Sequence, residues 1–246
     1  MNKKIKTSVA LLASAFLLAS CAAGGGLPSE QKSPVDYVNP YMGNISHLLV
    51  PTYPTVHLPN SMLRVYPERA DFTGDMLSGL PVIVTSHRGS SAFNLSPYQG
   101  EESGLKPVIN YSYDHEKIYP YRYQVYLDDN NIDVDFAPSH QSAVYGITFE
   151  GEGPAYLIFN SRNGQLKSDG KSVSGYQFVD RKTKVYLYAE TDKAPQQCGV
   201  LGDNTVKYGE TSVEGKDAAL VLSYGNDVKK LGVRYGISII SEDQAK

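Results

Sequence analysis

One polar segment carries side chains that suit the binding of a sugar. The run 85–91 follows the apolar run Leu80–Val84, so the chain leaves a predicted strand there and enters a loop. Hydroxyl and imidazole groups exchange hydrogen bonds with sugar hydroxyls, and a guanidinium offers a fixed fork of donors. The substrate contacts predicted here are Ser86, His87, Arg88 and Ser90. An ordinary polar surface loop is the alternative interpretation.

Pairs of carboxylates are a second kind of candidate, because two carboxyl groups on either side of a glycosidic bond can hydrolyse it. The sequence offers three close pairs, but spacing alone does not raise any of them above solvated surface residues. We therefore predict no catalytic residue from spacing. The pairs are Asp71 with Asp75, Glu101 with Glu102, and Asp114 with Glu116.

Metal and phosphate motifs are missing from the sequence. None of the 5 histidines lies three or four residues from another, and neither HExxH nor CxxC occurs. The run 128–131 (DDNN) lacks the glycine and distal glutamate of a calcium loop and predicts a hairpin turn. We predict no metal site, no cofactor in this chain and no nucleotide-binding loop.

The N-terminus has the pattern of an export signal. Lysines at the start precede an apolar run, and small residues then lead to Cys21. The ending LASC resembles a bacterial lipobox, in which the cysteine is acylated and becomes the new N-terminus. The prediction is a lipoprotein exported to the outer membrane or cell surface, held by a lipid anchor alone. The other cysteine, Cys198, then has no disulfide partner and is predicted to be a small half-buried residue.

Composition narrows the class of protein. The 246 residues are 41% hydrophobic and 20% charged, which is typical of a globular chain. A net charge of -3 disfavours nucleic-acid binding, which needs a basic face. The 19 tyrosines, with 7 phenylalanines and no tryptophan, suit half-wetted strands.

Short alternating runs dominate the rest of the chain, as in 121–127 (YRYQVYL) and 132–136 (IDVDF). Turn signals separate them, among them 128–131, 168–170, Asn163-Gly164 and Glu214-Gly215. This pattern predicts an all-β fold, an antiparallel β-sandwich. Residues 36–120 are rich in Pro, Gly, Ser and His, so we expect them to be less regular and to carry function.

Four segments are similar, in order, to stretches of one known domain family. Residues 36–43 (DYVNPYMG) are like V-N-P-F-I-G. The segment from His47 through 51–54 to Pro67 is like H-x-x-P-G-A followed by P-F-G-M-V-Q-L-S-P. Residues 113–132, running on to Tyr145, are like S-H-E-x-E-x-A-x-P-G-Y-Y-x-V-x-L-x-D, and 233–241 are like a closing strand. Together they resemble the N-terminal domain of glycoside hydrolase family 92.

The resemblance implies a domain of calcium-dependent, inverting exo-α-mannosidases. In that family the sandwich forms one wall of the sugar pocket, and a following (α/α)-barrel domain supplies the acid, the base and most calcium ligands. The family's share of that wall maps here to His47, Tyr53 and 86–90. The glycine-rich start and a pocket tryptophan are absent from this sequence, so the resemblance does not specify the glycan or the linkage.

Three functional hypotheses follow. The first is the N-terminal, mannose-glycan-contacting domain of a surface α-mannosidase whose helical catalytic domain lies outside this chain. The second is a standalone lipid-anchored glycan-binding or scaffold protein. The third is a self-sufficient hydrolase that uses Asp71, Asp75 or Glu116. The predicted organisation is a signal at 1–20, a flexible tether at 21–34 and the sandwich at 35–242.

Overall fold

The computed structural model describes residues 32–43, 52–69, 74–85, 91–203 and 205–246. It divides into two units, Met1–Tyr37 and Val38–Lys246. In the first unit, Pro34–Tyr37 forms the 3-10 helix η1, and the Asp36 carboxylate accepts from Ser33 N at 2.8 Å. The predicted signal, Cys21 and most of the predicted tether lie outside the described residues. Among the residues described, no helix has the length and apolar character needed to cross a membrane.

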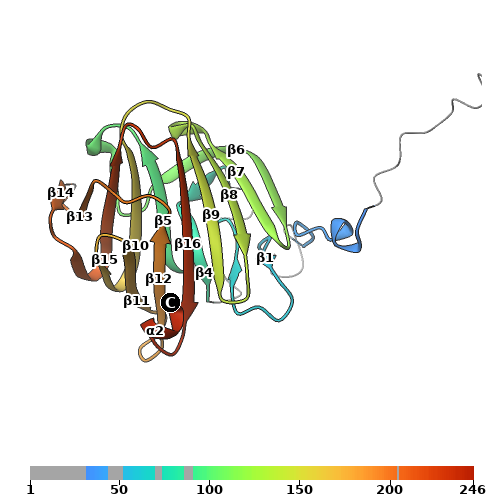
Figure 1. The fold of residues 1–246 in the computed structure, drawn as a ribbon. Helices are drawn as coiled ribbons and strands as arrows, with labels where there is room; N and C mark the ends of the chain where they lie inside the picture. Colours follow the sequence, from blue (N-terminus) through green and yellow to red (C-terminus); the bar gives the residue numbers. More distant parts are fainter. Residues whose placement is uncertain (1–31, 44–51, 70–73, 86–90, 204) are drawn as a thin grey trace, which may run out of the picture. The chain divides into compact units, whose positions relative to one another are not determined.

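The regular secondary structure described in the second unit is almost entirely β-strand, and the pairings between these strands are antiparallel (Figure 1). The predicted all-β antiparallel sandwich is confirmed. The strands are β1 (Val56–His57), β2 (Arg64–Val65), β3 (Met76–Ser78), β4 (Leu80–Val84), β5 (Ser91–Gln99), β6 (Asn110–Tyr119), β7 (Arg122–Leu127), β8 (Ile132–Pro138), β9 (Ser142–Phe149), β10 (Ala155–Ser168), β11 (Ser172–Phe178), β12 (Lys184–Thr191), β13 (Gln197–Gly202), β14 (Thr205–Tyr208), β15 (Ser212–Gly225) and β16 (Lys230–Ser238). The short helices are η2 (Glu102–Gly104), η3 (Asp128–Asn130) and α2 (Glu242–Ala245).

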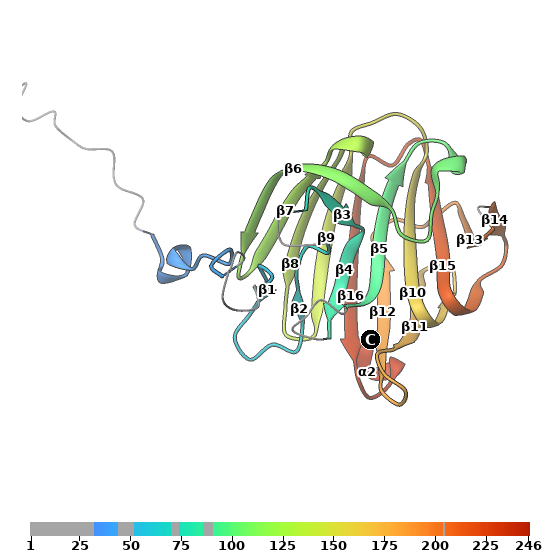
Figure 2. The same ribbon diagram turned by 180° about the vertical axis from the view of Figure 1, so that it is seen from behind.

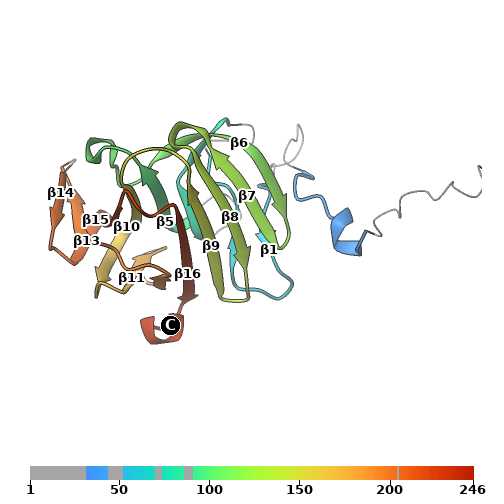
Figure 3. The ribbon, with the colours of Figure 1, turned by 45° about the horizontal axis from the view of Figure 1, so that its top comes forward.

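The long strand β10 joins the two layers of the sandwich. Its first part, 155–160, pairs with β5, and its second part, 164–168, pairs with β11. From β5 the sheet continues to β4, and from β11 it continues through β12, β16, β9, β8, β7 and β6 to β3. Figure 2 shows β4 and β5 in front of this second series. On its other side β10 pairs with β15, beyond which lie β13 and β14 (Figure 3).

Period-two patterns place the core between the layers. In β8, Ile132, Val134 and Phe136 are buried, while Asp133 and Asp135 point to the opposite face. The side chains of Ile132, Val134 and Phe136 belong to one continuous apolar cluster that includes residues of both layers. Burial of this kind supplies most of the favourable free energy of folding.

The period-two pattern does not identify strand β5. Every residue of β5 except Tyr98 is buried, polar ones included. A strand covered on both faces has no alternation to detect. Residues 36–120 were expected to be less regular, yet they include the nine-residue β5 and the ten-residue β6.

Buried tyrosines tie the layers together with their hydroxyls. Tyr145 on β9 donates to the Pro81 carbonyl at 2.8 Å, and Tyr235 on β16 donates to the Val82 carbonyl at 2.8 Å. Both carbonyls belong to β4, which pairs only with β5 among the described strands. The facing layer thus satisfies polar groups of an edge strand, which explains why this core uses tyrosine where phenylalanine would leave carbonyls unpaired.

A single glutamine fills the fork where β5 leaves β10. Gln177 Oε1 accepts from the backbone N–H of Phe93 at 2.8 Å and of Arg162 at 3.1 Å, and Nε2 donates to Ser91 O at 3.3 Å. Since the ladder between β5 and β10 ends at this point, the side chain replaces backbone partners that the divergence removes.

The turns predicted at Asn163-Gly164 and Glu214-Gly215 are both wrong, because the two segments are strands that pair with each other. Asn163-Gly164 lies within β10 and Glu214-Gly215 within β15, where Gly164 pairs with Gly215. A Cβ at Gly164 would collide with the Tyr176 carbonyl oxygen of β11. The glycine therefore permits close approach of a third strand and does not form a turn.

Other predicted turns are confirmed. Residues 128–130 form η3 and Asn131 adopts a left-handed conformation with φ 50°. In the turn between β10 and β11, Asp169 Oδ1 accepts from the N–H of Lys171 at 2.9 Å and of Ser172 at 2.7 Å. Those backbone donors lower the pKa of Asp169.

Candidate functional site

The candidate site is built around a stacked pair of tyrosines. The rings of Tyr53 and Tyr66 lie 4.3 Å apart and nearly parallel, at 12°. Tyr66 follows β2 directly and is 3% exposed, whereas Tyr53 is half-buried. The outer ring of the stack is thus presented by Tyr53 and supported from beneath. Both rings border a hollow of about 290 Å³ lined by Pro40, Met42, Thr52, Tyr53, Thr55, Arg64 and Tyr66.

Charged residues surround the Tyr66 hydroxyl. Arg64, Tyr66 and Glu68 alternate along the chain, and Glu68 forms an ion pair with Arg162 of β10. Burial raises the pKa of Tyr66, Glu68 adds to the rise, and Arg162 and Arg64 oppose it. Tyr66 therefore stays a neutral hydroxyl, able to donate and accept. We call Tyr53, Arg64, Tyr66, Glu68 and Arg162 the Tyr53 face.

Several described residues near the Tyr53 face hydrogen-bond to residues distant in the sequence. Thr52 N donates to Gly43 O at 2.9 Å, so the ends of the chain on either side of 44–51 are hydrogen-bonded to each other. Ser91, which follows 86–90, donates to Glu68 Oε2 at 2.7 Å. Glu68 and Arg69 themselves directly precede 70–73. Glu68 therefore bonds both Ser91 and Arg162.

A second charged group, the buried arginine cluster, begins at the next residue. Arg69 and Glu116 form an ion pair with side chains only 6% and 11% exposed. Arg69 Nη1 donates to the Tyr113 hydroxyl at 2.6 Å, and the Tyr123 hydroxyl donates to Glu116 Oε1 at 3.2 Å. Burial, with the neighbouring Glu116 carboxylate, raises the pKa of Tyr41 to about 12. We define the cluster as Arg69, Tyr113, Glu116 and Tyr123.

These groups suit binding better than bond cleavage. An aromatic face, fixed guanidinium groups and a neutral hydroxyl match a polyhydroxylated ligand. Glycoside hydrolysis needs one carboxylic acid and one carboxylate on opposite sides of the bond. Glu68 and Glu116 are each engaged by an arginine, so we assign neither role to the residues described.

The structure describes one of the predicted contact residues, Tyr53, and its role stays a prediction. Tyr53 lies on the candidate site, beside Arg64 and Tyr66. The other predicted contacts and the lipidation residue lie outside the described residues, and their roles stay predictions. These are His47, Ser86, His87, Arg88, Ser90 and Cys21.

The sequence did not predict the other residues of the Tyr53 face. Some of them follow a pattern that could have indicated them, and one does not. Arg64, Tyr66 and Glu68 recur every second residue, so their pattern could have indicated one face of an extended segment. Arg162 could not have been found, because it lies 94 residues from its partner Glu68.

Of the three carboxylate pairs weighed in the sequence, Asp114 and Glu116 have different surroundings in the fold. A register shift between β6 and β7 spans Asp114 and Lys117. Asp114 is 70% exposed, while Glu116 is buried with Arg69. Glu102 accepts from the Tyr208 hydroxyl at 2.9 Å. Asp75 is exposed, and Asp71 lies outside the described residues.

Within the described ranges, no three His, Cys, Asp or Glu side chains gather closely enough to hold a metal ion. We derive no step through calcium. Cys198 is half-buried, and burial raises the pKa of its thiol, which is the opposite of activation.

A family comparison identifies the domain. Residues 37–238 match the model of the glycosyl hydrolase family 92 N-terminal domain. Because the match covers most of the chain, the protein belongs to this family, and the prediction made from the four segments is confirmed. A search of curated proteins finds no match.

Solved structures of similar fold are family 92 enzymes. The inverting mannosidase BT2199 of Bacteroides thetaiotaomicron VPI-5482 shares 23% identity at a TM-score of 0.73, over 87% of this chain and 33% of that one. The α-mannosidase BT3965 of Bacteroides thetaiotaomicron shares 20% identity at 0.72, over 86% of this chain and 34% of that one. The glycosyl hydrolase ccman5 shares 16% at 0.62, over 79% and 31%. This chain thus spans about a third of the length of these relatives.

Proposed function

We propose that this chain is the N-terminal domain of a surface exo-α-mannosidase-type hydrolase. The observation that carries the proposal is the match of residues 37–238 to the family 92 N-terminal domain. In this proposal a second, (α/α)-barrel domain supplies the acid and the base, and the Tyr53 face forms one wall of the sugar pocket. The aromatic ring of Tyr53 stacks against the apolar side of a mannose unit, and Arg64 and the Tyr66 hydroxyl bond its hydroxyls.

The first experiment measures the mass of the native protein in the source membrane fraction with an antibody to residues 35–240. A product far heavier than 26.9 kDa that releases mannose from an α-mannoside supports the proposal. A product near 26.9 kDa that binds mannosides without turnover replaces it with the standalone glycan-binding hypothesis. Turnover by a product of that small size, lost on Glu116→Gln, would support the self-sufficient hydrolase instead.

The second experiment tests the Tyr53 face in the native enzyme. Tyr53→Ala should raise KM for an α-mannoside about tenfold, since it removes ground-state stacking. Tyr53→Leu, which keeps much of the apolar area over Tyr66, should also raise KM. The matched control is Tyr186→Ala, a half-buried tyrosine on β12. Unchanged KM in both Tyr53 variants would exclude this wall from the pocket.

Anchoring and metal dependence belong to the same proposal. We expect the native protein to incorporate labelled palmitate and to lose the label on Cys21→Ser. We also expect chelation to abolish hydrolysis by the complete enzyme while the melting of the sandwich stays unchanged, because the calcium ligands are proposed to lie in the barrel domain. A palmitate label that survives Cys21→Ser, or full activity after chelation, would contradict these two expectations.

A further inference from the structure

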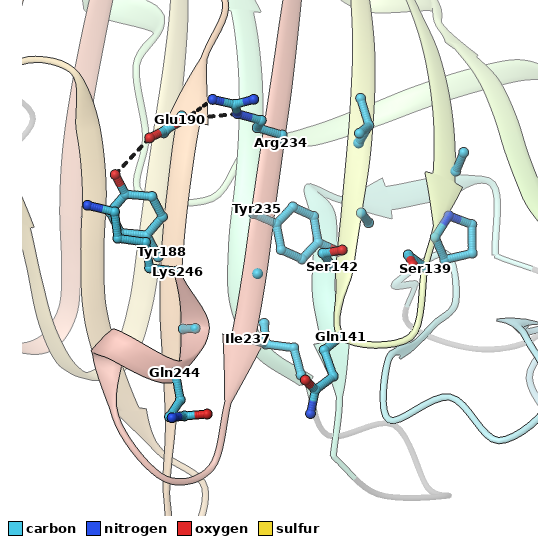
Figure 4. Close-up of a pocket in the computed structure, with 16 residues that line it drawn as sticks. Ser139, Gln141, Ser142, Tyr188, Glu190, Arg234, Tyr235, Ile237, Gln244 and Lys246 are labelled. Carbon is cyan, nitrogen blue, oxygen red and sulfur yellow. Dashed lines mark hydrogen bonds and ion pairs between the residues drawn. The ribbon is translucent and has the colours of Figure 1, made fainter.

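A separate groove of about 780 Å³ opens on the outer face of the sandwich. Its residues come from the ends of β8 and β9, from β12 and β16, and from the segment of α2 (Figure 4). None of the residues that form the Tyr53 face lines it. Its volume lies within the range of small-molecule sites, roughly 300–1,000 Å³.

One glycine creates a wall of the groove. A Cβ at Gly236 of β16 would collide with the carbonyl oxygen of Ala245 in α2. The missing side chain lets α2 lie directly against the strand, where Ala245 is buried. Glu242 fixes the other end of α2 through an ion pair with Lys167 at 3.0 Å. The short helix is therefore held in place as a rim.

A fixed polar group forms the opposite rim. The Tyr188 hydroxyl donates to Glu190 Oε1 at 2.8 Å, and Arg234 Nε donates to Glu190 Oε2 at 2.8 Å. Arg234 remains 75% exposed and Glu190 30% exposed, so the pair keeps hydrogen-bonding capacity toward solvent. Lys246 Nζ lies 5.2 Å from the centre of the Tyr188 ring. We call Tyr188, Glu190 and Arg234 the groove triad.

Amide and hydroxyl side chains complete the lining. Figure 4 shows Gln141 and Gln244 at one end of the groove, Ser139 and Ser142 along one side, and the groove triad at the other end. Amides and hydroxyls both donate and accept, while the carboxylate accepts and the guanidinium donates. A phosphate or carboxylate ligand needs donors only, whereas this lining includes the Glu190 carboxylate, which is paired with Arg234, beside one further cation, Lys246. The mixed set matches hydroxyl groups, each of which is also both donor and acceptor.

We infer that this groove is a second binding site, distinct from the Tyr53 face, for a neutral carbohydrate. The ligand places its hydroxyls against Arg234, Glu190 and Gln244, beside small side chains such as Ala137. Tyr188 also borders a second hollow of about 480 Å³, which is lined by serines, Thr211 and the charged residues Lys167, Asp169 and Glu242.

The test locates bound sugar directly on the native protein. The probes are photoreactive diazirine derivatives of methyl α-mannoside, methyl β-galactoside and methyl β-glucoside, each competed with its plain disaccharide. After irradiation, mass spectrometry maps the labelled peptides. We expect labelling within 137–144 or 234–246 by at least one probe. Arg234→Ala and Tyr188→Ala should each reduce it at least tenfold.

Matched variants separate this site from the other one. Arg122→Ala removes a similarly exposed arginine–carboxylate pair, with Asp135, from the same sheet, and Tyr186→Ala removes the tyrosine two residues before Tyr188. Both should leave the label unchanged, as should Tyr53→Ala. Labelling confined to peptides around 52–69 would overturn the groove while supporting the Tyr53 face. No labelling within 137–144 and 234–246, or labelling indifferent to Arg234→Ala, would also overturn it.

Discussion

Two groups of Arg, Glu and Tyr on this sandwich lie in opposite surroundings. In the buried arginine cluster the arginine and glutamate side chains are 6% and 11% exposed, and tyrosine hydroxyls from β6 and β7 complete the group. In the groove triad the corresponding exposures are 75% and 30%. Burial removes water from charged groups. Removing one partner of the buried arginine cluster therefore leaves the other charge uncompensated, whereas removing one partner of the groove triad leaves the other charge solvated. The same residue types can therefore stabilise the fold in one place and remain open to a ligand in another, depending on how much solvent surrounds them.

The largest effect should come from breaking the buried pair. Glu116→Ala should destabilise the folded protein by about 3–5 kcal/mol, because Arg69 is left buried without its counter-ion. The change is read from urea unfolding followed by circular dichroism. Glu190→Ala is the control and should leave the midpoint almost unchanged. Equal shifts in the two variants would remove the distinction between the groups.

A smaller effect should follow from removing one hydroxyl. Tyr123→Phe deletes the donor to Glu116 and should cost about 1.5 kcal/mol, typical of a buried hydrogen bond to a charged group. Tyr188→Phe deletes the equivalent donor to Glu190 at the surface. It should give no measurable change in the same unfolding assay. A larger loss for Tyr188→Phe than for Tyr123→Phe would reverse the comparison.

The exposed carboxylate should reveal its partners through titration. The Tyr188 hydroxyl and then Arg234 lower the pKa of Glu190. A carboxylate with a lowered pKa in the folded state stabilises the fold above its unfolded pKa, and that contribution is lost as pH falls through the folded value. Nuclear magnetic resonance should show the pKa of Glu190 rising both in Tyr188→Phe and in Arg234→Ala. A pKa that does not move in either variant would mean the triad is not formed in solution.

The smallest effect on stability should come from Arg234→Ala. Its side chain is 75% exposed, so solvent replaces the ion pair and Tm should stay within error of the wild type. Arg69→Ala, its buried counterpart, should lower Tm clearly. Calorimetry measures both. A drop for Arg234→Ala as large as that for Arg69→Ala would assign the groove triad a structural role.

The sequence by itself determined the class of the fold and its family. Alternating runs such as 132–136 predict strands because a half-wetted strand must alternate, and ordered segments between 36 and 241 indicate the family. The turns at 128–131 and 168–170 were also readable, since Asn and Asp side chains bond their own backbone.

Only the tertiary structure decided which residues meet. Gly164 read as a turn, yet it serves the close approach of β11 and pairs with Gly215. The ion pair of Glu68 with Arg162 joins residues that are 94 positions apart in the sequence. The sequence also does not show that the buried arginine cluster is buried and the groove triad exposed, because both consist of the same residue types. Local pattern reports how one segment meets water, whereas pairing across the sandwich depends on packing between segments that are distant in sequence.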